Sequence, residues 1–89
     1  MIRVEVTIVN KLGLHARAAA KFVTTASAFQ CRIHVLRGEQ VVNGKSIMGL
    51  MMLAAARGTT LCIIADGNDE QAAVRRLEKL VADRFGEAE

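Results

Sequence analysis

Alternation of apolar and polar side chains opens the chain and predicts its first strand. From Ile2 to Ile8 every second residue is apolar, a period that is typical of a strand with one buried face. The same alternation over residues 31–35 predicts a second strand, and a turn at residues 37–39 leads to a short third strand at Val41-Val42, so that the two form a hairpin. The stretch 60–65 is apolar nearly throughout, which predicts a fourth strand in the centre of the sheet.

Helical spacing of apolar residues marks three further segments. It predicts a first helix over Ala16–Ser27 and a shorter second helix over Ile47–Ala56, with Ser46 as the N-cap and Gly58 ending it. Acidic side chains at positions 69 and 70 suit the start of a third helix, and the residues from Gly86 onward are expected to fray. The expected buried stripe of this third helix comprises Ala73, Leu77, Leu80 and Val81.

The order of these elements is β-α-β-β-α-β-α, and their connections are short. This favours a two-layer α+β fold, an open-faced sandwich in which helices cover one face of a four-stranded antiparallel sheet. The 89 residues are expected to form one domain, 1–89, with an aliphatic core, since 52% of them are hydrophobic and only 3% are aromatic. The uncovered sheet face is expected to carry Arg3, Glu5, Arg32 and His34.

Charge and cysteine content narrow the classes of function. A net charge of +3 fits acidic partners and does not predict avid binding of nucleic acid. Cys31 and Cys62 form neither a CxxC motif nor a Cys/His cluster, so no metal site is expected. Two buried free thiols in a reducing cytosol are favoured over a disulfide. Without a signal peptide or an apolar run of about 18–20 residues, we expect a cytoplasmic protein that does not insert into membranes.

The segment Gly13-Leu14-His15-Ala16-Arg17 lies where a loop leads into the first helix. Free N–H groups and the positive end of the helix dipole favour a neutral imidazole there, and a neutral imidazole is a nucleophile. Arg17 can pair with a phosphate group, which indicates a site that carries a phosphoryl group. From the residues alone, a loop histidine without chemistry, serving at most as a helix cap, is an equally good interpretation.

Two motifs then point to a known family. Leu12–Arg17, followed by Ala18-Ala19, closely resembles the active-site segment of HPr, the histidine-containing phosphocarrier family of the bacterial phosphotransferase system. Asn43–Leu50 resembles the second signature of that family, and Gly58-Thr59 and Asp69–Ala72 match as well. The resemblance covers almost the whole chain with segment lengths preserved.

The resemblance implies a phosphocarrier rather than an enzyme, working as a monomer without a cofactor. His15 would accept a phosphoryl group at Nδ1 from phosphorylated enzyme I and pass it to the A domain of a sugar permease. Arg17 and the backbone amides of Ala16 and Arg17 would stabilise that group. Ala18 departs from the family, which usually has proline there; because proline fixes φ in the first turn, alanine leaves the helix start less constrained.

Ser46 has a structural and a functional interpretation. As a plain N-cap it stabilises its helix by about 1 kcal/mol. The resemblance implies that an ATP-dependent HPr kinase/phosphorylase phosphorylates it as a regulatory switch. A phosphate at a helix N-terminus would be tolerated by the fold, and its charge would repel acidic docking surfaces.

The second helix is apolar on all sides, although a two-layer domain buries only one side of a surface helix. Leu50 and Leu53 are expected to face the sheet, leaving the methionines partly exposed; the alternative is that they fill the core. Flexible methionines suit a surface that contacts several partners, and the resemblance implies docking through the first two helices. The expected partner-binding residues are Ala20, Lys21, Thr24, Lys45, Ile47, Met48, Met51 and Met52.

Two other functions remain as alternatives. One is a regulatory interaction module of the same system, nitrogen-type or dependent on Ser46, that serves no sugar transport. The other is a small RNA-binding domain, because RRM-like folds share the β-α-β-β-α-β order. Such domains stack bases on aromatic side chains of the sheet, whereas Phe22, Phe29 and Phe85 all lie outside the predicted strands.

Overall fold

A single antiparallel sheet forms one layer of the computed structural model, which describes residues 1–89. Its spatial order is β1-β4-β2-β3, so β4 lies inside the sheet as predicted, and β1 and β3 form the edges. Register is set by pairs such as Val4 with Ile63 and Val35 with Ile63. The strands are β1 (Ile2–Thr7), β2 (Arg32–Arg37), β3 (Gln40–Asn43) and β4 (Thr60–Asp66).

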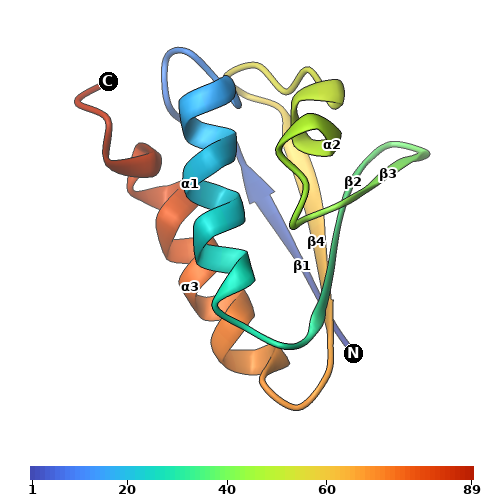
Figure 1. Ribbon diagram of the computed structural model, residues 1–89. Helices are drawn as coiled ribbons and strands as arrows, with labels where there is room; N and C mark the ends of the chain where they lie inside the picture. Colours follow the sequence, from blue (N-terminus) through green and yellow to red (C-terminus); the bar gives the residue numbers. More distant parts are fainter.

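The helices form the second layer and cover one face of the sheet, with α1 lying between α2 and α3 (Figure 1). The predicted two-layer α+β fold is therefore confirmed, and α1 begins and ends where the apolar spacing placed it. None of the helices has the length and hydropathy that a bilayer crossing requires. They are α1 (Ala16–Ser27), α2 (Ile47–Met52), α3 (Glu70–Ala82) and a short 3-10 turn, η1 (Arg84–Gly86).

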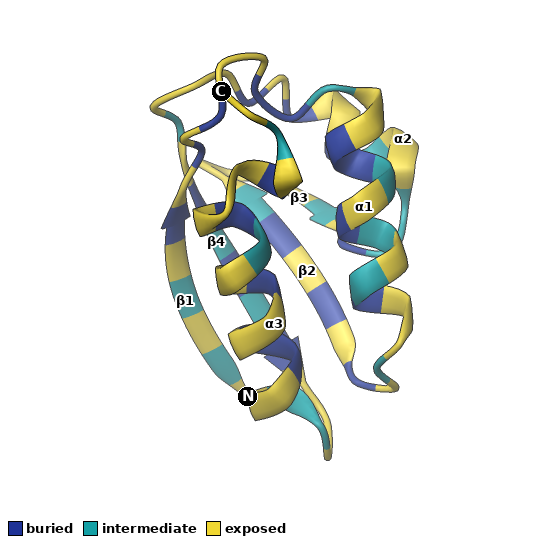
Figure 2. Ribbon diagram, turned by 90° about the vertical axis from the view of Figure 1, so that its left-hand side faces the viewer, coloured by how far each residue is buried: buried dark blue, intermediate teal, exposed yellow.

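The core lies between the two layers, and the strand pattern explains it. Buried and exposed residues alternate along β2 (Figure 2), with Ile33 and Val35 packed inward. They meet Phe22 of α1 and Leu77 of α3 in one continuous apolar cluster. The charged residues predicted on the opposite face are all exposed: Arg3, Glu5, Arg32 and His34.

At three positions the burial in the structure differs from the burial that the sequence predicts. Val74 is buried in the α3 stripe, whereas Leu80 is only half-buried because it lies at the margin of the core. Both cysteines are free thiols; Cys31 is buried, and Cys62 is half-buried because it lies on the outward side of β4.

The second helix is shorter than predicted: α2 ends at Met52, and Gly58 does not end it. The chain turns at Ala54, whose φ is 49°, and this turn brings the buried Ala55 back toward the loop before α1. Arg37 Nη1 donates to the carbonyls of Leu53 and Ala54, at 2.7 and 3.1 Å, so the early end of the helix leaves these groups paired. Tertiary contacts therefore override the helical preference of the alanine run.

The C-terminal segment, residues 83–89, does not fray, so that expectation was wrong. Phe85 is only 1% exposed, and Lys21 Nζ donates to its carbonyl at 2.6 Å. Farther along, the backbone N–H of Lys11 donates to the carbonyl of Glu89 at 2.7 Å. The buried ring of Phe85 and these hydrogen bonds help to hold the segment folded back beside the start of α1 (Figure 1).

Candidate functional site

The loop before α1 is fixed by a hydrogen bond within the loop and by another to the segment that follows α2. Asn10 is fully buried, and its Nδ2 donates to the carbonyl of Gly13 at 2.8 Å. Gly13 has a φ of +70°, and an added Cβ would lie 2.6 Å from the carbonyl oxygen of Ala55. The same oxygen accepts the backbone N–H of Leu14 at 2.9 Å. This close backbone approach, which only glycine permits, fixes the loop two residues before His15.

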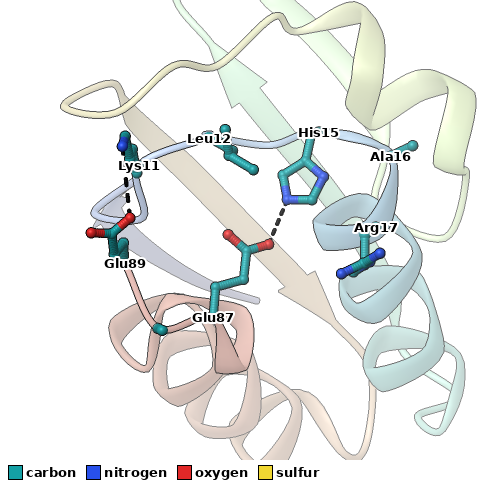
Figure 3. Close-up of a pocket in the computed structure, with 8 residues that line it drawn as sticks. Lys11, Leu12, His15, Ala16, Arg17, Glu87 and Glu89 are labelled. Atoms are coloured by element: carbon teal, nitrogen blue, oxygen red, sulfur yellow. Dashed lines mark hydrogen bonds and ion pairs between the residues drawn. The ribbon is translucent and has the colours of Figure 1, made fainter.

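His15 is the N-cap residue of α1, but its side chain does not cap the helix. Its carbonyl accepts the N–H of Ala19 at 2.8 Å, while its ring is half-buried. Nε2 lies 2.5 Å from Oε2 of Glu87. The other ring nitrogen, Nδ1, points toward the side of Ala16 and Arg17 (Figure 3). The side chain of His15 therefore contacts Glu87 instead of capping the helix.

Glu87 is a site residue that sequence reasoning missed. Besides contacting His15, its carboxylate accepts a hydrogen bond from Nδ2 of Asn10 at 3.0 Å. The hydrogen bonds from Asn10 and His15 hold the pKa of Glu87 below its usual range. The carboxylate is therefore negatively charged at neutral pH. Seventy-two positions separate it from the histidine, and no local motif signals such a contact.

Arg17 is exposed in the first turn of α1, and its guanidinium lies within 4.0 Å of no carboxylate. It borders an open pocket of about 730 Å³ beside the histidine (Figure 3). On the opposite side, Lys11 Nζ lies 3.7 Å from a carboxylate oxygen of Glu89. The lining residues are Lys11, Leu12, His15, Ala16, Arg17, Glu87, Ala88 and Glu89.

Free backbone donors complete this site. The first N–H that bonds within α1 belongs to Ala19, so those of Ala16, Arg17 and Ala18 precede the intrahelical ladder. Ala18 is fully buried and the helix still begins at Ala16, so alanine at this position keeps the helix start in place. With a cationic side chain and free N–H groups beside an imidazole, the pocket can bind an anion next to a nucleophile.

Ser46 is the N-cap of α2, as predicted. Its Oγ accepts the backbone N–H of Gly49 at 3.1 Å. Its neighbour Lys45 is engaged elsewhere, since Nζ donates to the carbonyl of Phe29 at 2.6 Å. Neither residue lines the pocket around the histidine, so the structure separates the two predicted phosphorylation sites.

The α2 residues form an exposed apolar patch, as expected. Met48 is 76% exposed, and the underside of the helix is occupied by the buried Leu50, with Leu53 following it. We call the exposed side chains the methionine patch: Ile47, Met48, Met51 and Met52.

The residues predicted for docking on α1 divide into two groups. Ala20 is half-buried and Thr24 is exposed, with Oγ1 of Thr24 donating to the carbonyl of Ala20 at 2.9 Å. Lys21 instead holds the C-terminal segment through Phe85.

Known proteins are similar to this chain in both fold and sequence. A family model described as the PTS HPr component phosphorylation site matches residues 2–83. The phosphocarrier protein HPr of Neisseria meningitidis is 53% identical over 89 residues, covering all of both chains. A crystal structure of HPr-C-His from Thermoanaerobacter tengcongensis superposes with a TM-score of 0.96 at 45% identity, again over all of both chains. The phosphocarrier protein NPr of Shewanella violacea is 43% identical, over 94% of this chain and 92% of its own.

These matches define the class as a phosphocarrier protein, which is not an enzyme. The chain belongs to the HPr family of the phosphotransferase system.

Proposed function

We propose that His15 carries the phosphoryl group, accepting it at Nδ1 from phosphorylated enzyme I and passing it to the A domain of a sugar permease. The observation that carries this proposal is the orientation of the ring: Nε2 is engaged by Glu87, whereas Nδ1 is turned toward the start of α1. Arg17 and the N–H groups of Ala16 and Arg17 lie where they can receive the phosphoryl oxygens.

In the proposed reaction, the lone pair of Nδ1 attacks phosphorus while the bond between phosphorus and the donor atom of enzyme I breaks. The electron pair of the broken bond returns to that donor atom. Cationic and N–H groups stabilise the transferring phosphoryl group through charge-assisted hydrogen bonds. The site is exposed and open, which limits how tightly it holds the product and suits a carrier that must release its phosphoryl group.

Incubation with enzyme I and labelled phosphoenolpyruvate tests this assignment. We expect one acid-labile phosphoryl group per chain, located on His15 by mass spectrometry. The chain has two histidines, and His34 lies on the exposed face of the sheet outside the pocket. Label on His34, or no label at all, would refute the assignment.

We further propose that partners dock on the methionine patch together with Ala20, Lys21, Thr24 and Lys45. In this proposal the chain acts as a single domain and as a monomer. An apolar surface of flexible side chains accommodates partners of different shapes. The net charge of +3 favours partners with acidic docking surfaces.

Met48→Asp tests the docking proposal. The exposed position leaves the free energy of unfolding within about 0.5 kcal/mol of wild type. Burying the new carboxylate against an apolar partner should raise the KM of enzyme I for this protein at least about tenfold, or about 1.4 kcal/mol. The matched control is Val41→Asp, which adds the same charge to an exposed residue of edge strand β3 and should leave KM unchanged. Equal KM values for the two variants would contradict the proposal.

We propose that phosphorylation of Ser46 by an HPr kinase regulates docking, because the hydroxyl caps α2 beside the methionine patch. A phosphate there is compatible with the helix dipole, so its effect would fall on partners rather than on the fold.

Ser46→Asp is expected to keep α2 capped and to raise the KM of enzyme I about tenfold through like-charge repulsion. Ser46→Asn is the control, since asparagine caps equally well without the charge. Stopped-flow measurements of phosphoryl transfer give the KM of enzyme I for both variants. If aspartate and asparagine behave alike, partners do not sense charge at this position.

A nitrogen-type regulatory branch is the second candidate, favoured by the similarity to the NPr of Shewanella violacea. Rates of transfer from the phosphorylated protein to A domains of the two kinds separate the candidates. Faster transfer to the A domain of a sugar permease supports the first, and faster transfer to the nitrogen-type domain supports the second.

A further inference from the structure

Glu87 lies outside residues 2–83, the part of the chain that the family model matches, yet its carboxylate contacts the acceptor histidine directly. We propose that Glu87 is a positioning residue that holds the proton of His15 on Nε2 and orients the ring with the lone pair of Nδ1 toward the phosphoryl donor. This inference rests on the proposed role of His15.

The position of the carboxylate is set by the fold. Oε1 accepts from Nδ2 of the buried Asn10, and the same Nδ2 donates to the carbonyl of Gly13 in the loop that leads to His15. The amide of Asn10 thus joins the carboxylate to the backbone just before the histidine. Oε2 is left to receive the imidazole N–H.

The backbone that carries Glu87 is anchored on both sides. Upstream, Phe85 is buried and its carbonyl is held by Lys21. Downstream, Glu89 is held by Lys11 through a backbone hydrogen bond and a salt bridge. The side chain of Glu87 is itself only 16% exposed. A carboxylate held in this way costs little further ordering when it contacts the ring.

The chemistry assigns a purpose to this contact. A neutral imidazole has one proton, and the hydrogen bond made by one nitrogen determines which nitrogen keeps it. A carboxylate at Nε2 keeps the proton there and prevents the ring from turning Nε2 toward the donor. The hydrogen bonds that lower the pKa of Glu87 keep this acceptor charged at neutral pH.

The same contact balances charge during transfer. The N–P bond forms from the lone pair of Nδ1, and the donor atom of enzyme I recovers the electron pair of the bond that breaks. Because the Nε2 proton stays in place, the phosphorylated ring carries a positive charge, which the carboxylate of Glu87 compensates. A protonated ring is also the better leaving group when the phosphoryl group is passed on, so the contact serves both directions of transfer.

Glu87→Ala and Glu87→Gln test the proposal, with Glu78→Ala as the control that removes a carboxylate from the exposed face of α3, outside the pocket around His15. We expect kcat for transfer from enzyme I to fall about tenfold in Glu87→Ala, with KM within twofold of wild type. Glutamine keeps an acceptor oxygen but no charge, so Glu87→Gln should lie between alanine and wild type. Glu78→Ala should keep the wild-type kcat.

A spectroscopic readout separates positioning from mere anchoring of the segment. In wild type the Nε2 proton of His15 should give a slowly exchanging resonance in ¹H–¹⁵N spectra, and this resonance should disappear in Glu87→Ala. Wild-type kcat in both Glu87 variants, or an equal loss in Glu78→Ala, would overturn the proposal. So would an Nε2 resonance that survives in Glu87→Ala. Any of these results would overturn the role of Glu87 and leave the proposed role of His15 intact. Absence of label on His15 in the wild type would refute the role of His15 independently.

Discussion

His15→Ala is expected to abolish phosphoryl acceptance while the domain stays folded. The ring is half-buried and does not cap α1, so its removal deletes one hydrogen bond to Glu87 and opens no cavity in the core. We expect a loss of about 2 kcal/mol in the free energy of unfolding, typical of a hydrogen bond to a charged group. No other imidazole lines the pocket beside Arg17, so labelling of the histidine site by enzyme I and phosphoenolpyruvate should fall to background.

The matched control is His34→Ala, which removes an imidazole from the exposed face of the sheet. It should accept label at the wild-type rate. Urea unfolding of both variants separates chemistry from stability. Label retained by His15→Ala would place the acceptor elsewhere, and an unfolded His15→Ala would make the histidine structural.

Gly13→Ala is expected to cause a large loss of stability. Its φ of +70° costs an alanine about 1–2 kcal/mol, and the new Cβ would lie 2.6 Å from the carbonyl oxygen of Ala55. Backbone must move to relieve that contact, which adds about 1–3 kcal/mol. The expected total is about 3 kcal/mol, measured by urea unfolding. Because Leu14 bonds to the same carbonyl, phosphoryl acceptance should fall as well.

Gly38→Ala isolates the steric part of this effect. Gly38 has a φ of +58° and no atom within 4 Å of an added Cβ. An alanine there therefore has the unfavourable backbone conformation of Gly13→Ala without its steric clash. Gly38→Ala should lower the free energy of unfolding by about 1 kcal/mol and leave phosphoryl acceptance unchanged. Equal losses in the two variants would show that the approach to Ala55 does not constrain the loop.

Periodicity predicted most of the fold, because alternation and helical spacing report directly which side of each element faces the core. It predicted the limits of α1 and the inner place of β4 correctly. It overestimated α2 because an alanine run favours a helix locally, whereas the turn at Ala54 depends on contacts with Leu14 and Arg37. Distant contacts of this kind leave no periodic signal in the sequence.

The candidate site likewise has one part that the sequence predicts and another that only the fold brings together. His15 and Arg17 are adjacent to one helix start, so a short motif contains both. Glu87 reaches the same place only through the fold, held by Asn10 and by the burial of Phe85. Sequence reasoning treated its segment as a frayed end because chain termini with polar residues usually are. Only the three-dimensional arrangement reveals that contact.

The 72-residue separation between His15 and Glu87 also matters for folding. A contact of that span closes a loop as long as most of the chain, so it forms only when both ends of the domain have folded together. The C-terminal segment is small and Phe85 is its one buried apolar side chain, so we expect it to open at a lower free energy than the central strands. The imidazole therefore acquires its carboxylate partner only in a fully assembled domain, and a partly unfolded chain presents its histidine without one.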